Sequence, residues 1–223
     1  MIIIVDEREA VLNGYSACFD REGIPVTGLL PADFGAWVGD AAAEDMSCVE
    51  AFLLGDFGAR RDLPGKIKAR SAAPVIALSD ARSLDETLNL FASGVDDVLR
   101  KPVHVREILA RINAITRRTA GEDADKGNAP LRCYFDGRDP EVAGAPMPLP
   151  RRERRILEYL VQNRGRRVTK AQIFNHVYGL LDDGIDENVI ESHTSKLRKK
   201  LRHRLGYDPI DSQRYLGYRL LVA

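Results

Sequence analysis

Acidic, hydroxyl and lysine side chains follow the short apolar runs in the first half of the chain. In chain order they are Asp6, Glu7, Asp56, Ser79 and Lys101. Paired carboxylates such as Asp6 and Glu7 repel each other unless a cation or a proton joins them, and Mg²⁺ is the oxygen-liganded ion that would suit them. A lysine and a hydroxyl are what the outer oxygens of a phosphoryl group need. These residue types indicate an acidic cleft that could hold Mg²⁺ and a phosphoryl group.

These side chains converge only if the apolar runs are parallel strands of one sheet. The runs are Ile2–Val5, Pro25–Thr27, Val49–Leu54, Pro74–Leu78 and Val95–Leu99. Each is followed by apolar residues at helical spacing, most clearly over residues 105–115. Five such units predict a parallel sheet covered by helices on both faces, because parallel strands need helical crossovers. In a doubly wound sheet, ligands bind beyond the carboxyl ends of the strands, where the polar set stands.

Three segments of this half resemble the receiver domain of bacterial response regulators: IIIVDE, PVIALS and GVDDVLRKPVHVREILARI. The resemblance implies a flavodoxin-like (βα)5 fold. It also implies that Asp6 and Glu7 are metal ligands, that Ser79 senses a phosphoryl group and that Lys101 is the counter-ion of that group.

Two positions depart from the receiver pattern. The family ends its third strand in the aspartate that accepts the phosphoryl group, whereas here Gly55 stands there and Asp56 comes one residue later. A one-residue shift reverses the side-chain direction on a strand, so Asp56 is an acceptor only if the following loop turns it into the cleft. The family's aromatic switch residue is replaced by Val98. We expect a receiver that acts mainly without phosphorylation; the alternative is a conventional regulator phosphorylated on Asp56 by a histidine kinase.

Simpler roles stay open for the same residues. Asp6 and Glu7 could cap the next helix, since carboxylates favour helix N-termini. Lys101 could pair with Asp6 and close the site without any ligand. In these cases no cofactor is required. A metabolic enzyme is disfavoured, because no glycine-rich phosphate loop follows the first strand and no nucleophile–base pair is recognisable. We expect no enzymatic activity.

Receivers of this family pair through their fourth and fifth helices, and the resemblance implies salt-bridging positions at Asp97, Glu107 and Arg111. The fourth helix is expected over Leu84–Ser93, which contains no Lys or Arg. The cation expected opposite Glu107 is therefore missing. A homodimer through this face stays a prediction, and an ordinary solvated face is the alternative.

Charge divides the chain into two unlike halves. Residues 1–118 carry 14 Lys and Arg against 18 Asp and Glu, whereas residues 131–223 carry 18 against 12. A basic domain suggests a polyanionic partner, most often nucleic acid. Thr119–Pro130 contains no large apolar residue, which is typical of a linker. The sequence thus predicts a receiver at 1–118, a linker at 119–130 and a DNA-binding domain at 131–223.

The second half predicts a small antiparallel sheet, three helices and a closing hairpin. Helices are expected over Arg152–Gln162, from a capping box at Thr169, and near Glu187–Arg204. On the third helix one stripe is apolar: Ile190, Thr194, Leu197 and Leu201. The opposite face is polar and basic, as a helix in the major groove needs. A solvated Lys/Arg face is the plainer alternative.

The segments LPRRERRILEYLVQNRGRRVTKAQIFNHVYG, DENVIESHTSKLRKKL and DSQRYLGYRL resemble the winged-helix effector domain of the OmpR/PhoB family. The helix face and this resemblance together give the candidate DNA contacts: Asn188, Ser192, Ser195, Lys196, Arg198, Lys199, Arg202, Ser212 and Arg214. Tyr215 replaces a glycine of the family's wing, which puts the groove contact of the wing in doubt. The loop Leu180–Glu187 lies where the family often meets RNA polymerase.

The whole chain, including the segments VDERE, GVDD and LPRRERRILEYL, resembles orphan flagellar transcriptional regulators of the FtcR or Rem type, which are OmpR-like proteins with degenerate receivers. The resemblance implies a sequence-specific DNA-binding regulator that activates flagellar genes. Its expected partners are double-stranded promoter DNA, RNA polymerase and a second copy of the chain. "Flagellar" rests on the resemblance alone.

The sequence predicts a cytoplasmic protein without a membrane partner. No apolar run approaches the roughly 18 to 20 residues of a membrane-spanning helix, and the first residues lack the basic region of a signal peptide. Cys18, Cys48 and Cys133 are odd in number and show no CxxC spacing. They are expected to be reduced thiols rather than disulfides or zinc ligands.

Overall fold

The computed structural model describes residues 1–119, 130–134, 137–179 and 185–221. The chain forms two compact units, Met1–Ala120 and Gly121–Ala223. Most of the predicted linker, residues 120–129, lies outside the described residues. Within the described ranges, no helix combines the length and the apolar character needed to cross a membrane.

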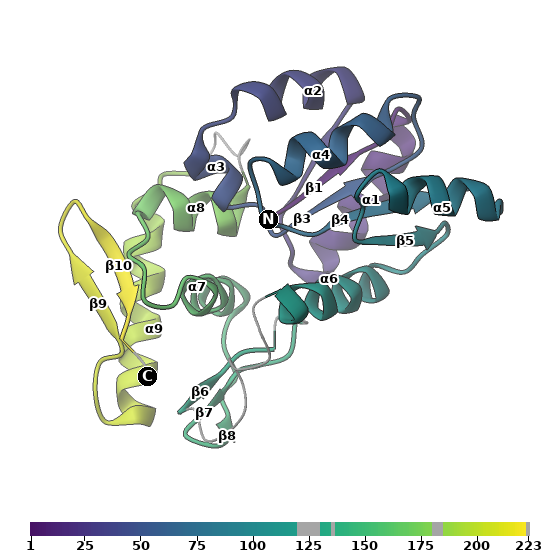
Figure 1. The fold of residues 1–223 in the computed structure, drawn as a ribbon. Coiled ribbons are helices and arrows are strands. Elements are labelled where there is room, and N and C mark those ends of the chain that lie inside the picture. The colour runs from purple at the N-terminus through teal and green to yellow at the C-terminus, as the bar shows by residue number, and fades with distance from the viewer. Residues whose placement is uncertain (120–129, 135–136, 180–184, 222–223) are drawn as a thin grey trace. The chain divides into compact units, whose positions relative to one another are not determined.

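The N-terminal unit contains a five-stranded parallel sheet (Figure 1). Its strands are β1 (Ile2–Val5), β2 (Val26–Leu29), β3 (Ala51–Leu54), β4 (Val75–Ser79) and β5 (Asp97–Arg100). They lie in the order β2-β1-β3-β4-β5, which is the flavodoxin-like order of a doubly wound sheet. The predicted fold class is confirmed. Because the order reverses between β1 and β3, the crevice of the fold opens beyond their carboxyl ends.

Helices cover this sheet on both faces. They are α1 (Glu9–Glu22), α2 (Pro31–Asp40), α3 (Ala43–Ser47), α4 (Leu63–Lys68), α5 (Leu84–Ala92) and α6 (Val105–Thr119), with the 3-10 turn η1 (Arg60–Asp62) before α4. Figure 1 shows α6 on the side of the sheet opposite to α2 and α4. Alternate residues of a strand point to opposite faces, so Ile2 and Ile4 pack in the core with α1 and α6. On the other face, the Phe34 ring of α2 lies 6.0 Å from that of Phe52.

The C-terminal unit is a winged helix. It contains a small antiparallel sheet of β6 (Leu131–Arg132), β7 (Glu141–Val142) and β8 (Ala145–Pro146), then α7 (Arg151–Gln162), α8 (Lys170–Tyr178), α9 (Val189–Leu205) and the hairpin β9 (Ile210–Gln213)–β10 (Gly217–Leu220). The predicted capping box is confirmed: Thr169 Oγ1 accepts from the Gln172 amide at 3.1 Å, and Gln172 Oε1 accepts from the Thr169 amide at 2.8 Å. The predicted apolar stripe of α9 is buried, as expected.

Candidate functional site

The carboxyl ends of the parallel strands bring four of the five predicted residues into one cluster. Lys101 Nζ lies 3.1 Å from Asp6 Oδ2 and 3.1 Å from Asp56 Oδ2. Ser79 Oγ lies 3.5 Å from Asp56 Oδ1. The turn after β3 therefore directs the Asp56 carboxylate into the cleft. Glu7 differs: its side chain is exposed, and no hydrogen bond or ion pair among the described residues joins it to the cluster.

A buried arginine that the sequence reasoning missed stands in the middle of this cleft. Arg60 in η1 is 5% exposed. Its guanidinium donates to Asp56 Oδ1 at 2.6 Å, to Glu86 Oε1 of α5 at 2.8 Å and to the Gly55 carbonyl at 3.1 Å. The i,i+4 spacing from Asp56 to Arg60 was the available sequence signal. Arg60 therefore brings a buried positive charge to two carboxylates of the cleft, those of Asp56 and Glu86.

A second arginine closes the outer side of the cleft. Arg8 Nε donates to Asp6 Oδ1 at 3.1 Å, and its Nη2 donates to Asp80 Oδ2 at 2.9 Å. Lys101 Nζ also lies 3.5 Å from Asp80 Oδ2. Lys101 thus forms an ion pair with Asp6, as the simpler reading of the sequence allowed.

The two central carboxylates are held in their charged forms. Burial raises the pKa of Asp6, but hydrogen bonds from Arg8 and Lys101 outweigh it, and the pKa lies below its ordinary value. Burial likewise raises the pKa of Asp56, but the Asp80 backbone amide, Lys101 and Arg60 lower it by more, so this pKa also lies below its ordinary value. Both carboxylates are therefore ionised at neutral pH and are neutralised from within the chain.

The Mg²⁺ that the receiver pattern implies does not fit this arrangement. A carboxylate offers about four acceptor positions. Asp6 accepts four hydrogen bonds, from the backbone amide, Nε and Nη2 of Arg8 and from Lys101. Asp56 also has four donors, namely Arg60, Lys101, Ser79 and the backbone of Asp80. Across the described residues, no group of three or more His, Cys, Asp or Glu side chains is arranged to hold a metal.

Gly55 stands where the receiver pattern has its acceptor aspartate, and the structure shows why no side chain is present. A Cβ built on Gly55 would lie 2.1 Å from Asp6 Oδ2 and 2.7 Å from its Cγ. Real Cβ atoms essentially never approach so closely. Any side chain at position 55 would push Asp6 away from Lys101, so the glycine and the ion pair depend on each other.

The outer face of α9 forms the second candidate site. Asn188, Ser192, Ser195, Lys196, Lys199 and Arg202 are exposed on it, as the helical periodicity predicts. Within the described chain, Lys196 and Lys199 have no ion pair. Asn188 Oδ1 accepts from Lys170 Nζ at 2.7 Å. The face thus presents hydroxyl, amide and ammonium groups to solvent, which suits hydrogen bonding to base edges or phosphates.

The sequence comparisons decide the family of this chain. It is 58% identical to the flagellar transcriptional regulator FtcR of Brucella abortus, over 98% of each chain. It is 30% identical to the sensory transduction protein RegX3 of Mycolicibacterium smegmatis, again over 98% of each. The chain belongs to the family of the flagellar transcriptional regulator FtcR. Residues 144–220 match the domain family described as transcriptional regulatory protein, C terminal.

One solved structure matches along most of the chain. The response regulator DrrB of Thermotoga maritima, an OmpR/PhoB homologue, is 23% identical to this chain over 98% of it and 97% of DrrB, with a TM-score of 0.42.

Two of the basic residues that the sequence predicts to contact DNA, Arg198 and Arg202, share one carboxylate. Arg198 donates to Asp208 Oδ2 at 2.6 Å through Nη2, and Arg202 Nη2 donates to the same oxygen at 2.6 Å. Asp208 follows Gly206, whose left-handed backbone ends α9 and returns the chain along it. The two contacts with Asp208 hold the guanidinium groups of Arg198 and Arg202 at the C-terminal part of α9. Sequence periodicity gave no sign of this contact.

Asp208→Asn is expected to lower the free energy of unfolding of the C-terminal unit by about 1 to 2 kcal/mol at pH 7. Burial raises the pKa of Asp208, but Arg198 and Arg202 lower it from 3.8 to about 2. A depressed pKa gives stability that is fully present above the unfolded value and is lost as the pH falls through about 2. Urea unfolding followed by circular dichroism should show the difference from wild type shrinking between about pH 4 and 2. A difference that stays constant would contradict the prediction.

The charged residues of the predicted dimerisation face form ion pairs with one another within the chain. Arg111 lies 3.3 Å from Asp97 and 3.7 Å from Glu107. On α5, three apolar side chains at helical spacing are exposed: Leu84, Leu88 and Phe91. The face therefore combines an intramolecular charge pair with an apolar stripe.

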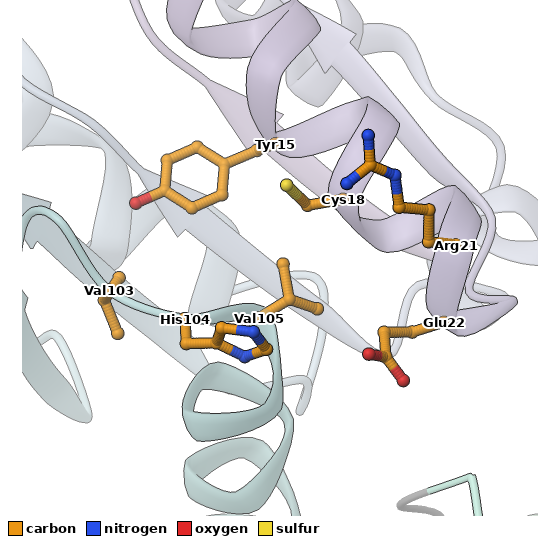
Figure 2. Close-up of a pocket in the computed structure, with 7 residues that line it drawn as sticks. All are labelled: Tyr15, Cys18, Arg21, Glu22, Val103, His104 and Val105. Carbon is orange, nitrogen blue, oxygen red and sulfur yellow. The ribbon is translucent and has the colours of Figure 1, made fainter.

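A shallow pocket lies between α1 and the segment that leads into α6 (Figure 2). Tyr15 and Cys18 of α1 face His104 across it. Glu22 at its edge is paired with Arg106 at 2.9 Å. Cys18 and His104 are exposed, so the pocket does not desolvate these groups. All three cysteines, Cys18 included, are free thiols.

Proposed function

We propose that the chain is a sequence-specific DNA-binding regulator that activates flagellar genes and whose receiver works mainly without phosphorylation. One observation carries the proposal for the receiver: Arg60 and Lys101 neutralise the cleft from within. A phosphoryl group on Asp56 would have to displace Arg60 from an ion pair of 2.6 Å. The site also lacks coordination positions for the Mg²⁺ that phosphoryl transfer requires.

A conventional phosphorylated receiver is the second candidate. It is favoured by the position of Asp56, whose carboxylate lies in the cleft beside Lys101 and Ser79. A histidine kinase or a small phosphate donor would then supply the phosphoryl group. The two candidates differ in one chemical property, the covalent state of Asp56.

Purified protein incubated with acetyl phosphate and Mg²⁺ is expected to show no gain of a phosphoryl group, because Asp56 is paired with Arg60 and Lys101 and its acceptor positions are taken. Intact mass measurement checks this, with Asp56→Ala treated in parallel. Folding and DNA binding of the same sample are verified first. A gain of one phosphoryl group that disappears in Asp56→Ala would establish the conventional mechanism.

The DNA-binding proposal is supported by the exposed face of α9 and by the matched C-terminal domain family. Ser192, Ser195, Lys196 and Lys199 would contact base edges, and Arg198, Arg202, Ser212 and Arg214 would contact phosphates or the minor groove. Asn188 begins the helix at the same face. Dimers should bind half-sites about 10 to 11 base pairs apart.

Lys196→Ala is expected to reduce the preference for target over random DNA by about tenfold or more, since a contact to a base edge is worth about 1 to 3 kcal/mol of discrimination. Fluorescence anisotropy with both duplexes measures the ratio. Arg164→Ala, which removes an exposed charge from the turn after α7, is the matched control and should leave the ratio unchanged. Equal losses on both duplexes for Lys196→Ala would rule out base contact.

The partners of the proposed regulator follow from its two surfaces. Promoter DNA would bind α9, and a second copy of the chain would cover the apolar stripe of α5. RNA polymerase would meet the loop Leu180–Glu187, of which residues 180–184 lie outside the described residues. We place this activity in the cytoplasm, with no membrane partner and no enzymatic step.

A further inference from the structure

The carboxylate of Asp208 lies against the C-terminal end of α9, in the short segment that joins α9 to β9 (Figure 1). Gly206 ends α9 with a left-handed backbone, φ +81°, and its amide donates to the Arg202 carbonyl at 2.9 Å. Beyond that turn, Asp208 Oδ1 accepts from the Ile210 amide at 3.2 Å. The turn and this hydrogen bond together fix the carboxylate beside the helix.

Two arginines of α9 hold this carboxylate from the helix side. Arg198 donates to Asp208 Oδ2 through Nε at 3.0 Å and through Nη2 at 2.6 Å. Arg202 donates to the same oxygen at 2.6 Å. Burial raises the pKa of Asp208, but the two arginines lower it by more, to about 2. At neutral pH, one negative charge therefore faces two positive charges.

The contact uses the edge of Arg198 that suits an anion with two oxygens. A guanidinium binds carboxylates and phosphates in the same forked geometry, through two parallel N–H groups. Here the Nε and Nη2 groups of Arg198 both donate to Asp208. A phosphate of the DNA backbone presents a similar pair of oxygens. Asp208 and a DNA phosphate are thus alternatives for one edge of Arg198.

The two arginines are held without being removed from the surface. The side chain of Arg202 is 57% exposed, and that of Arg198 is 33% exposed. Solvent also reaches Asp208, whose side chain is 22% exposed. Ion pairs that solvent reaches contribute little net free energy. A phosphate can therefore replace the carboxylate, but it has to displace it first.

The residues proposed to contact base edges are not held in this way. Among the described residues, no ion pair involves Lys196 or Lys199, and both are exposed. Phosphate contacts act on all DNA sequences alike, whereas base contacts distinguish them. An internal partner on the phosphate contacts alone lowers the affinity for every sequence. Stable binding then depends more strongly on the base contacts.

We propose that Asp208 is an internal competitor for the DNA backbone: it occupies Arg198 and Arg202 in the free protein and is displaced by phosphates on binding. The inference rests on the DNA binding proposed above. Asp208 sets the strength and the salt dependence of binding, and the exposed face of α9 sets the sequence preference. Random DNA is thereby bound weakly, and the chain is retained where bases are contacted.

Asp208→Asn in the full chain tests the proposal, because it removes the charge and keeps the size of the side chain. Two duplexes are used, one selected by wild type from a random pool and one of random sequence. The variant should bind both about tenfold more tightly, with a ratio between them within about twofold of wild type. The slope of log affinity against log salt should steepen by about one to two, since each released arginine neutralises one more phosphate. Fluorescence anisotropy measures both quantities, and circular dichroism verifies folding at the same temperature.

Asp139→Asn is the control for net charge. It is the same substitution in the same unit, but its carboxylate accepts from the Leu149 amide at 3.2 Å and lies 3.8 Å from Arg154 of α7. It should leave the salt slope unchanged.

A second control removes the two cations. In an Arg198→Gln, Arg202→Gln background, Asp208→Asn should change the affinity for either duplex by less than about twofold, because no arginine is left to release. The gain in affinity seen in the wild-type background should therefore disappear.

Each contrary outcome has a distinct meaning. If Asp208→Asn weakens binding to both duplexes, the carboxylate positions the arginines for DNA and the competitor is wrong. If it strengthens binding no more than Asp139→Asn does, or equally without the two arginines, the effect is one of net charge and the competitor is again wrong. In these cases DNA binding stands. If wild type enriches no sequence and binds neither duplex, the proposed function fails, and the competitor with it.

Discussion

Arg60→Ala is expected to destabilise the N-terminal unit by about 3 to 5 kcal/mol, the usual cost of removing one partner from a buried charge pair. The guanidinium is buried between Asp56 and Glu86, at 2.6 and 2.8 Å. Without it, Asp56 keeps its ion pair with Lys101, and Glu86 keeps only the 3.9 Å contact with the exposed Arg61 among the described residues. The single tryptophan, Trp37, lies on α2 of the same unit. Urea unfolding followed by its fluorescence reports this unit.

Arg61→Ala is the matched control for Arg60→Ala. Arg61 is the next residue, is 53% exposed and lies 3.9 Å from the same Glu86. An exposed pair of this kind contributes little, so the change should stay within about 0.5 kcal/mol. Similar losses in both variants would mean that general charge, rather than the buried position of Arg60, stabilises the receiver.

Mg²⁺ gives a second measurement on the same variant. Removal of Arg60 takes the guanidinium away from Asp56 Oδ1 and from Glu86 Oε1. Carboxylate oxygens that have lost the guanidinium donor can serve as ligands for a hard cation such as Mg²⁺. Mg²⁺ should therefore raise Tm of Arg60→Ala and leave that of wild type unchanged, because a ligand stabilises only a fold that binds it. No response in the variant would show that Arg60 does not stand in for a metal.

The convergence of the strand-end residues could be predicted because it depends on topology alone. The carboxyl ends of parallel strands meet at one edge, so Asp6, Ser79 and Lys101 had to lie close together once the sheet was inferred. The position of Glu7 next to Asp6 in the sequence does not bring both side chains into the cleft, because the side chains of successive residues on a strand point in opposite directions. Only the first of the two carboxylates enters the cleft.

The two arginines of the cleft, Arg8 and Arg60, could not be predicted in this way. Arg60 joins Asp56 to Glu86, 26 residues further along the chain. A long side chain in a turn reaches many positions, and only packed geometry selects one. The same holds for Asp208, which meets Arg198 because the chain turns back after Gly206. Periodicity describes which face of an element is buried, but not which partner a flexible charged group selects.

Gly55→Ala is expected to destabilise the N-terminal unit by about 3 kcal/mol, because overpacking is combined with the disruption of a buried ion pair. The added Cβ would lie 2.1 Å from Asp6 Oδ2 and 2.9 Å from Asp6 Cβ. Asp6 would have to give up its 3.1 Å contact with Lys101. Gly58→Ala, three residues later, is the control: nothing lies within 4 Å of its built Cβ. It should change the free energy of unfolding by no more than about 0.5 kcal/mol.

A double-mutant cycle with Asp6→Gly, which removes the Cβ of residue 6 as well as its carboxylate, shows whether Asp6 is what excludes a side chain at position 55. If it is, Gly55→Ala costs much less in the Asp6→Gly background, and the two changes are non-additive by about 1 to 3 kcal/mol. Additive effects would mean that another contact forbids the side chain. A measured coupling would show that the missing acceptor and the ion pair between Asp6 and Lys101 are one structural feature. An aspartate could then return to position 55 only if that ion pair were broken.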